Sequence, residues 1–371
     1  MNAVDTTTNT PDSVDSKPKV LCAMSGGVDS TMAAALLSEQ GFEVVGSMAR
    51  FWPDDRPAGA FELCCSPEAA FDARRMADKL DVPFYLLDYR EAFERVVVDP
   101  FIPTYQKGET PNPCVWCNRD IKFGSFVKRA QMLGCEFLAT GHYVRRVDGE
   151  RGPELHRGKD DTKDQTYFLW ALPRAILPYL LFPLGDLSKD EVRQLAAERK
   201  LHVAIKKSSS GLCFITSSVR DYLEEFSEPK PGPIFDASED YKEIGQHKGL
   251  QFYTVGQRKG LGLYHSHLVR FVVELRPEDN SVVVGTREMC QWQSLTVTRA
   301  NFLADPKEVP KRVMAQTRYR QRPVSAEFTQ LSDDEFALTF DEPVFAVTLG
   351  QSAVIYSGDR LLGGGVINWR E

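Results

Sequence analysis

Short apolar segments alternate with amphipathic ones over roughly the first 200 residues, and this alternation restricts the fold more than any other feature of the chain. The apolar runs predict buried strands at 19–24, 44–49, 82–87 and 137–140. The amphipathic runs predict helices at 29–40, 71–80, 122–133 and 188–200. The last helix begins with the capping-box spacing of Ser188 and Glu191. Strands that alternate with helices predict an α/β fold, with a doubly wound and mostly parallel sheet.

The pattern changes after about residue 214. A helix is predicted at 219–226, and the Pro- and Gly-rich stretch at 228–233 has the composition of a linker. Beyond it, Gly, Pro and Asp divide short alternating runs, which predict strands at 271–274, 281–285, 312–316, 336–340, 351–356 and 365–369. We therefore expect two small β-rich domains, the last a β-barrel. The expected division is a disordered leader at 1–17, an α/β domain at 18–216, a central domain at 217–285 and a C-terminal domain at 286–371.

Composition narrows the class of protein. No apolar stretch in the 371 residues approaches the roughly 18 residues of a membrane span. The acidic, Ser- and Thr-rich start is unlike a secretory signal, and eight cysteines in such a chain indicate a reducing compartment. We therefore expect a cytoplasmic protein without a membrane partner. The net charge of −7 does not exclude a polyanionic partner, because residues 311–322 include five basic side chains and no acidic one.

The strongest local motif is Ser25-Gly26-Gly27-Val28-Asp29-Ser30, between the first predicted strand and the first predicted helix. Two glycines let backbone N–H groups turn toward a phosphate, and the start of a helix adds a positive dipole. Ser25 and Ser30 can donate hydrogen bonds to phosphate oxygens, and Asp29 can hold the Mg²⁺ of a triphosphate. The motif lacks the Gly-Lys-[Ser/Thr] end of a Walker A loop. It predicts a different kind of nucleotide site.

Ser-Gly-Gly-Val-Asp-Ser is the signature of the PP-loop ATP pyrophosphatases, which cleave ATP between the α and β phosphates and adenylate a substrate. Five further segments narrow the resemblance, namely Thr110-Pro-Asn-Pro-Cys-Val-Trp-Cys-Asn118, Ala139-Thr-Gly-His-Tyr143, Lys163-Asp-Gln-Thr-Tyr-Phe-Leu169, Ser209-Ser-Gly-Leu-Cys-Phe-Ile215 and Tyr253-Thr-Val-Gly-Gln-Arg-Lys-Gly-Leu-Gly262. Over residues 18–371 the chain resembles the bacterial-type tRNA-specific 2-thiouridylases, which make 2-thiouridine at the wobble position. The resemblance implies the PP-loop form of the α/β fold, which is like that of the adenine nucleotide alpha hydrolases. It also implies ATP with Mg²⁺ as cofactors, and a tRNA anticodon loop as partner.

The resemblance also implies roles for individual residues. It assigns ATP binding to Ala23, Met24, Ser25, Gly26, Gly27, Val28, Asp29, Ser30, Met48, Ala49 and Gly141, with Asp29 at the Mg²⁺. It assigns contacts with the target base to Asn112, Pro113 and Cys114. It assigns further tRNA contacts to His142, Lys163, Asp164, Gln165, Arg318, Tyr319 and Gln351, so that the C-terminal barrel contacts tRNA.

The reaction also needs a sulfur nucleophile, which cysteine can supply because a thiolate carries and exchanges persulfide sulfur. By resemblance, Cys213 takes sulfur from a donor protein, a cysteine desulfurase or a sulfur relay, and becomes the persulfide. Cys117 is the partner thiol that attacks it, frees the sulfur and ends in a Cys117–Cys213 disulfide. The alternative for the Cys114-x-x-Cys117 spacing is half of a zinc knuckle, but no second Cys/His pair occurs at zinc-finger spacing.

One residue departs from the best-known form of the family, in which an aspartate stands where Cys114 stands here. A thiol has a pKa near 8.5 and a carboxyl a pKa near 4, so the acid/base role of that aspartate does not transfer to Cys114. Cys114, Cys117 and Cys213 together resemble the ligand set of iron–sulfur-dependent tRNA thiolases. The sequence is therefore consistent with both a persulfide mechanism, which we favour, and an iron–sulfur mechanism.

Two alternative functions lie outside thiolation. One is a different PP-loop ATP pyrophosphatase, such as an amide-forming or lysidine-type ligase, which needs no pair of reactive cysteines. The other is a non-catalytic RNA-binding protein, which needs no pyrophosphate-binding loop. The motifs of this chain favour a tRNA sulfurtransferase over both.

Overall fold

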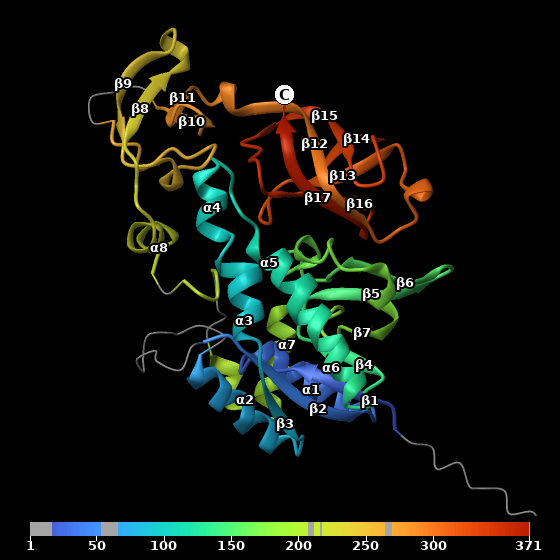
Figure 1. Ribbon diagram of the computed structural model, residues 1–371. Coiled ribbons are helices and arrows are strands. Elements are labelled where there is room, and N and C mark those ends of the chain that lie inside the picture. The colour runs from blue at the N-terminus through green and yellow to red at the C-terminus, as the bar shows by residue number, and fades with distance from the viewer. Residues whose placement is uncertain (1–16, 53–65, 207–210, 216, 264–268, 371) are drawn as a thin grey trace, which may run out of the picture.

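The structure is a computed structural model that describes residues 17–52, 66–206, 211–215, 217–263 and 269–370. The leader expected at 1–17 lies outside the described residues, apart from Lys17. Figure 1 shows an α/β region at the bottom, a small sheet at the upper left and a barrel at the upper right. No helix in the described ranges is long and apolar enough to cross a membrane.

The α/β region contains one parallel sheet with the strand order β3-β2-β1-β4-β7. Its strands are β1 (Lys19–Ala23), β2 (Glu43–Arg50), β3 (Phe84–Asp88), β4 (Phe137–Thr140) and β7 (Leu180–Leu181). Ala23, which ends β1, pairs with Thr140, which ends β4. The residues that follow these two strands therefore meet at the carboxyl edge of the sheet, where open α/β sheets bind ligands.

Helices cover both faces of this sheet because successive side chains of a strand point to opposite faces. Val20 and Cys22 of β1 pack in the cluster that includes α1 (Val28–Glu39), α2 (Pro67–Lys79) and α7 (Lys189–Glu198). Leu21, between them, packs in a different cluster with Phe126 of α6 (Phe126–Met132). The doubly wound sheet predicted from the sequence is confirmed.

A helical connection between β3 and β4 carries two of the predicted site cysteines. Its parts are α3 (Arg90–Phe93), a π-helical segment (Glu94–Val98), α4 (Phe101–Gln106), α5 (Pro113–Trp116), a second π-helical segment (Cys117–Ser125) and α6. The sequence predicted one helix that begins at 122, whereas the structure begins this helix at Pro113. Proline suits the first turn because its missing N–H would have no partner there. Cys114 and Cys117 therefore both lie on this helix.

The central region is a four-stranded sheet with the order β10-β11-β8-β9, preceded by α8 (Val219–Phe226). Its strands are β8 (Gly232–Asp236), β9 (Lys242–His247), β10 (Phe271–Arg276) and β11 (Ser281–Gly285). Ile234 and Val272 of this sheet share one buried cluster with Phe93 and Phe101 of the helical connection. The central sheet thus completes its core against the α/β region.

The C-terminal region is a six-stranded barrel, closed by the pairing of β12 with β17. Its strands are β12 (Gln291–Phe302), β13 (Arg312–Gln316), β14 (Val324–Gln330), β15 (Phe336–Phe345), β16 (Ser352–Ser357) and β17 (Arg360–Arg370). A hairpin of the α/β region, β5 (Val144–Gly149) with β6 (Gly152–Arg157), joins this sheet where His156 pairs with Arg360. The barrel is the one predicted, but its link to the hairpin was not predicted.

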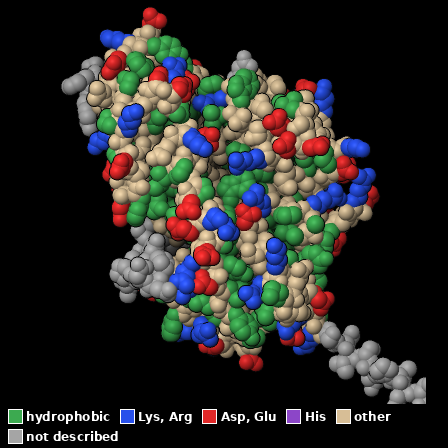
Figure 2. Space-filling model, viewed as in Figure 1, with side chains coloured by type: hydrophobic (Ala, Val, Ile, Leu, Met, Phe, Trp, Pro, Cys, Tyr) green, Lys and Arg blue, Asp and Glu red, His purple; other side chains and the backbone are tan. Residues whose placement is uncertain are grey.

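Short 3₁₀ turns connect the remaining elements. They lie at Thr166–Phe168, Arg174–Tyr179, His202–Ile205, Ala237–Glu239, Leu250–Phe252, Glu288–Cys290 and Pro306–Glu308. In Figure 2, basic and acidic side chains are intermingled on the face shown. A polyanion would therefore have to be recognised locally rather than by a field of one sign over this face.

Candidate active site

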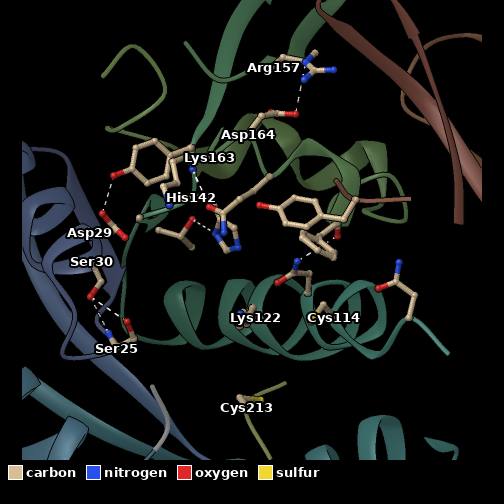
Figure 3. A pocket seen from close by; sticks show the side chains of 18 of the residues that line it. Ser25, Asp29, Ser30, Cys114, Lys122, His142, Arg157, Lys163, Asp164 and Cys213 are labelled. Carbon is tan, nitrogen blue, oxygen red and sulfur yellow. Dashed lines mark hydrogen bonds and ion pairs between the residues drawn. The ribbon is translucent and has the colours of Figure 1, made fainter. Parts of the chain in front are cut away.

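A cavity of about 1380 Å³ lies where the parallel sheet, α5 and the barrel meet. Its lining includes Asp29 from the β1–α1 turn, Cys114 from α5 and Tyr319 from the barrel. Figure 3 shows Ser25, Asp29 and Ser30 on one side and Cys114 on a helix on the other. The volume exceeds the roughly 300–1,000 Å³ of ordinary small-molecule sites, so the cavity has room for more than one ligand.

The β1–α1 turn leaves the start of α1 open to an anion. Gly26 has φ +70°, and a Cβ there would lie 2.2 Å from the Ala69 carbonyl oxygen, so only glycine fits. Gly27 is the N-cap of α1, and a Cβ on it would meet only Ser25 Oγ, at 3.7 Å. Gly27 has no side chain that could cap the first turn of this helix. Its first N–H groups and its dipole are therefore open to an anion such as a phosphate.

The serines of the motif converge at the same turn. The Ser25 backbone N–H donates to Ser30 Oγ at 2.9 Å, and the two hydroxyl oxygens lie 3.2 Å apart. Both side chains line the cavity. Two hydroxyls beside open helix N–H groups are suited to phosphate oxygens.

Asp29 is held by two side chains from outside the motif. Lys189 Nζ, at the start of α7, lies 2.6 and 2.7 Å from its two carboxylate oxygens, and Tyr143 Oη donates to it at 2.7 Å. The Lys189 side chain is only 9% exposed, whereas that of Asp29 is 32% exposed. Burial first, and then the Asp29 charge, raises the pKa of Tyr143, so this hydroxyl remains a donor. A buried cation and a carboxylate thus meet beside the phosphate-binding turn.

The ends of β2 and β4 form the adjoining wall. Met48 and Ala49 are buried and line the cavity. A Cβ on Gly141 would lie 2.8 Å from the Ser30 nitrogen, so glycine lets the end of β4 pack directly on the first turn of α1. His142 Nδ1 lies 2.8 Å from Thr140 Oγ1. Burial, and then the Lys122 charge, lowers the pKa of His142 to about 3, so this ring is neutral at physiological pH.

The three predicted site cysteines occupy different depths. Cys114 and Cys213 are half-buried and line the cavity, and Figure 3 shows them on separate segments of the chain. Cys117 is buried in the cluster that also contains Phe214. Cys213 packs against this same cluster. Cys117 is therefore a buried member of the apolar cluster against which Cys213 packs, and it does not line the cavity.

A turn of the barrel holds the chain segment that leads into α5. Gln351 Nε2 donates to the carbonyl oxygens of Thr110 and Pro111 at 3.1 and 3.0 Å, and the Thr110 N–H donates to the Leu349 carbonyl at 2.9 Å. The Asn112 Nδ2 group donates to Ser352 Oγ, and Pro113 begins α5. The segment that precedes Cys114 is thus bound along the barrel. We call the contacts of 349–352 with 110–112 the barrel clamp.

Two known proteins are similar to this chain over almost its whole length. A curated relative from Deinococcus radiodurans, described as "tRNA-specific 2-thiouridylase MnmA", is 54% identical over 94% of this chain and 92% of its own length. A Thermus thermophilus protein of the same description is 52% identical over 94% of each chain. The chain belongs to the tRNA-specific 2-thiouridylase family.

Family models agree with this assignment along the chain. Residues 18–217 match the model described as a tRNA methyl transferase HUP domain, 220–286 that of a tRNA methyl transferase PRC-barrel domain and 292–367 that of an aminomethyltransferase beta-barrel domain. Among solved structures, a 4-thiouridine synthetase–RNA complex with bound ATP matches at a TM-score of 0.38 and 17% identity, over 56% of this chain and 49% of that one. As a PP-loop member of the 2-thiouridylase family, the chain binds ATP.

Eight of the eleven ATP-binding residues implied by the 2-thiouridylase resemblance line the cavity. They are Ala23, Met24, Ser25, Asp29, Ser30, Met48, Ala49 and Gly141. Gly26, Gly27 and Val28 are not among its lining residues. Gly26 and Gly27 form the backbone of the turn, and the Val28 side chain packs in the core.

All three residues of the predicted Lys163-Asp164-Gln165 triplet line the cavity, but their burial and their contacts differ. Lys163 is half-buried and lines the cavity. Asp164 is buried, accepts hydrogen bonds from the Gly158 N–H and Thr166 Oγ1, and lies 3.6 Å from Arg157 Nε. Burial raises the pKa of Asp164. Gln165 Oε1 accepts from the Tyr143 N–H at 3.0 Å. Asp164 and Gln165 therefore shape the loop that presents Lys163.

The predicted tRNA-contacting residues of the barrel line two different cavities. Tyr319 lines the main cavity, where its ring packs on Phe168 with 4.4 Å between centroids. Arg318 and Gln351 line a second cavity of about 340 Å³, between the central region and the barrel. Arg318 Nη2 donates to the Val255 carbonyl and to Thr348 Oγ1 at 2.9 and 2.7 Å. Arg318 and Gln351 thus contact the junction between regions, while Tyr319 faces the cavity.

The cysteines do not form a metal site in this structure. No three His, Cys, Asp or Glu side chains of the described residues lie close enough together to hold a metal ion. The arrangement of Cys114, Cys117 and Cys213 seen here therefore does not fit a cluster held by all three. The carboxylate of Asp29, in contrast, has the oxygen chemistry that Mg²⁺ takes beside nucleotide phosphates.

Lys189 and Tyr143 are site residues that the sequence analysis missed. Lys189 lies in the first turn of α7, where the helix dipole disfavours a positive charge. That unfavourable placement was a signal that some other group balances the charge. The group is Asp29, 160 residues earlier in the chain.

Proposed function

We propose that this protein is a tRNA uridine 2-sulfurtransferase, which uses ATP to replace O2 of the wobble uridine with sulfur and releases AMP and pyrophosphate. The observation that carries the proposal is one cavity that contains the phosphate-binding turn, Cys114, Cys213 and an aromatic residue of the barrel. The 52–54% identity to relatives described as tRNA-specific 2-thiouridylases supports it. The expected setting is the cytoplasm.

The first step activates the base. The start of α1, with Ser25 and Ser30, binds the phosphates, and Mg²⁺ held near Asp29 would neutralise the charge of the leaving pyrophosphate. Lys189 forms an ion pair with the Asp29 carboxylate in this structure. Its ammonium group is therefore placed to move to a phosphate oxygen when Mg²⁺ and ATP bind. Uridine O2 attacks the α phosphorus, and pyrophosphate leaves.

The second step delivers sulfur. A donor protein loads Cys213 as a persulfide, and the Cys117 thiolate attacks the Cys213 sulfur. A Cys117–Cys213 disulfide forms as hydrosulfide leaves, so two thiols are oxidised and the transferred sulfur is reduced. Hydrosulfide attacks C2 of the adenylated uridine, and AMP departs. The packing of Cys117 and Cys213 in and against one apolar cluster supports this pairing.

The RNA partner is the anticodon loop of tRNA. Lys163, His142 and Tyr319 line the cavity and are placed to contact the loop, with Asn112, Pro113 and Cys114 beside the target base. Arg318 and Gln351 support the same contact from the second cavity and the barrel clamp. RNA recognition of this kind depends on bases that leave their stack and pack on aromatic side chains.

The test separates the persulfide mechanism from the iron–sulfur alternative. Iron-free enzyme, supplied with a persulfide donor, ATP and tRNA, is expected to form 2-thiouridine, and Cys114→Asp is expected to remain active. Cys213→Ser and Cys117→Ser are expected to form AMP without thiolated product. Dependence on iron together with an inactive Cys114→Asp variant would contradict the persulfide mechanism. Absence of AMP with and without tRNA would leave only an RNA-binding function.

A further inference from the structure

Asn118 ends the Thr110–Asn118 motif, and neither the resemblance nor the proposed mechanism gives it a role. It follows Cys114 by four residues along the continuous helix from α5 into the π-helical segment, so the two side chains lie on one side of that helix. Both residues line the main cavity. Asn118 is only 3% exposed, which is unusual for an asparagine outside a complete hydrogen-bond network.

The orientation of the Asn118 amide follows from its one hydrogen bond. Asn118 Nδ2 donates to the Phe168 carbonyl oxygen at 3.2 Å. A carbonyl oxygen can only accept, so the NH₂ group must face Phe168 and the amide oxygen must point elsewhere. That oxygen, Oδ1, is buried and has no hydrogen-bond partner among the described residues. Within the described chain, no other such atom belongs to a residue that lines the main cavity.

The neighbours of Asn118 are suited to a flat ring. Phe168, whose carbonyl holds the amide, packs its ring against Tyr319 at 4.4 Å and an interplanar angle of 43°. Tyr319 is close enough to Cys114 that the thiol influences the pKa of its phenol. Phe168, Tyr319 and Cys114 all line the cavity. Aromatic faces, a thiol and an unsatisfied acceptor therefore occupy one part of it.

We infer that Asn118 Oδ1 accepts a hydrogen bond from N3–H of the target uridine and thereby selects uridine over cytidine. Uracil carries a donor at N3 between its two carbonyl groups, whereas cytosine carries a lone pair at N3. The fixed amide oxygen of Asn118 would face the N3–H donor of uracil. In cytosine it would face the lone pair of N3, which is a second acceptor. A site that leaves a buried polar atom unpaired rejects the wrong ligand more strongly than a site that only lacks an attraction. This inference rests on the proposed uridine thiolation.

The test is a binding cycle with two RNA hairpins of the anticodon stem-loop, measured with a non-hydrolysable ATP analogue. One hairpin carries uridine at the target position, and the other carries 3-deazauridine, which has C–H in place of N3–H, keeps the C2 carbonyl and carries a hydroxyl group at C4. We expect the wild-type protein to bind the uridine hairpin about tenfold more tightly, as for the loss of one buried hydrogen bond. Asn118→Ala should bind the two hairpins equally.

Asn301→Ala is the matched control. Asn301 Nδ2 also donates to backbone carbonyls of this turn, those of Trp170 and Leu172, but Asn301 does not line the cavity. Asn301→Ala should keep the tenfold preference for the uridine hairpin. A preference that is unchanged in Asn118→Ala, or weaker ATP binding by that variant with the preference intact, would overturn the inference.

The wild-type protein alone provides a second test that does not depend on the variant's folding. Equal binding of the two hairpins by the wild-type protein would also overturn the inference. Thiolation of the uridine hairpin by the wild-type protein is scored separately. Its absence would contradict the proposed function, whereas a missing N3–H preference with intact thiolation would contradict only the role of Asn118.

Discussion

Replacing Lys189 with methionine tests the ion pair at the phosphate-binding turn. Methionine keeps most of the stem but removes the ammonium group that lies 2.6 and 2.7 Å from the Asp29 oxygens. Breaking a fully buried pair from one side costs about 3–5 kcal/mol. The Asp29 side chain is 32% exposed and keeps its bond from Tyr143, so water solvates part of the remaining charge. We therefore expect a loss of about 2 kcal/mol in the free energy of unfolding.

The assay is urea unfolding of the wild-type protein, Lys189→Met, Asp29→Asn and the double variant. The pair should show a coupling energy above about 1 kcal/mol, because either single change leaves the other group without its partner. Lys159→Met is the control, since the Lys159–Glu191 pair at the same helix start is half exposed in both partners. Its loss should cost less than about 1 kcal/mol.

The same variant tests the role of Lys189 toward the nucleotide. Lys189→Met should raise the Kd for ATP at least about tenfold, the range of one charged hydrogen bond. It should change the Kd for AMP little, because AMP lacks the β and γ phosphates. Additive stability effects would refute the coupling with Asp29. Unchanged ATP affinity would refute the transfer of Lys189 to a phosphate.

Three further predictions follow from the site. Asp29→Asn should abolish AMP formation while tRNA binding persists, and normal AMP formation would exclude Asp29 from the Mg²⁺ site. Burial lowers the pKa of His142 to about 3, so its ring stays neutral in the folded protein while the unfolded chain binds a proton below the ordinary pKa of histidine. The free energy of unfolding should therefore fall as the pH drops from about 6.5 toward 3. The loss should be at most about 1.4 kcal/mol per pH unit. His142→Asn should show a shallower loss between pH 6 and 5, and an equal loss would contradict the neutral ring. Arg320→Ala, on the cavity lining, should lower the salt slope of tRNA binding by about one. Arg318→Ala should lower it less, because its guanidinium group already bonds Val255 and Thr348.

Local signals explain what the sequence predicted well. The β1–α1 turn depends on two glycines and the start of one helix, all within six residues. The capping box at Ser188 and Glu191 is present because both of its hydrogen bonds lie within one turn. The strands at 281–285 and 312–316 have the predicted bounds because Gly, Asn and Pro mark their ends. In each case the physical cause lies next to the residues that it affects.

Long-range contacts explain what the sequence analysis missed. The sequence predicted no helix before residue 122, but Pro113 begins a helix whose first turn rests on the barrel clamp. Cys117 shares its buried cluster with Phe214, almost 100 residues later in the chain, and the Lys189–Asp29 pair joins residues 160 apart. The β5–β6 hairpin pairs with β17 through Arg360. Neither propensity nor periodicity in a short window contains such information.

The barrel clamp also sets an order for biosynthesis. The β1–α1 turn lies near the N-terminus, and its contacts with Ala69 and Lys189 come from the α/β region, which leaves the ribosome first. The segment before Cys114 reaches its final position only after residues 349–352 have been made, because they supply its hydrogen-bond partners. Contacts of such wide sequence separation form late in folding. A nascent chain would thus be able to hold nucleotide before its sulfur chemistry is assembled, and a chain truncated before the last barrel strands would lack a positioned Cys114.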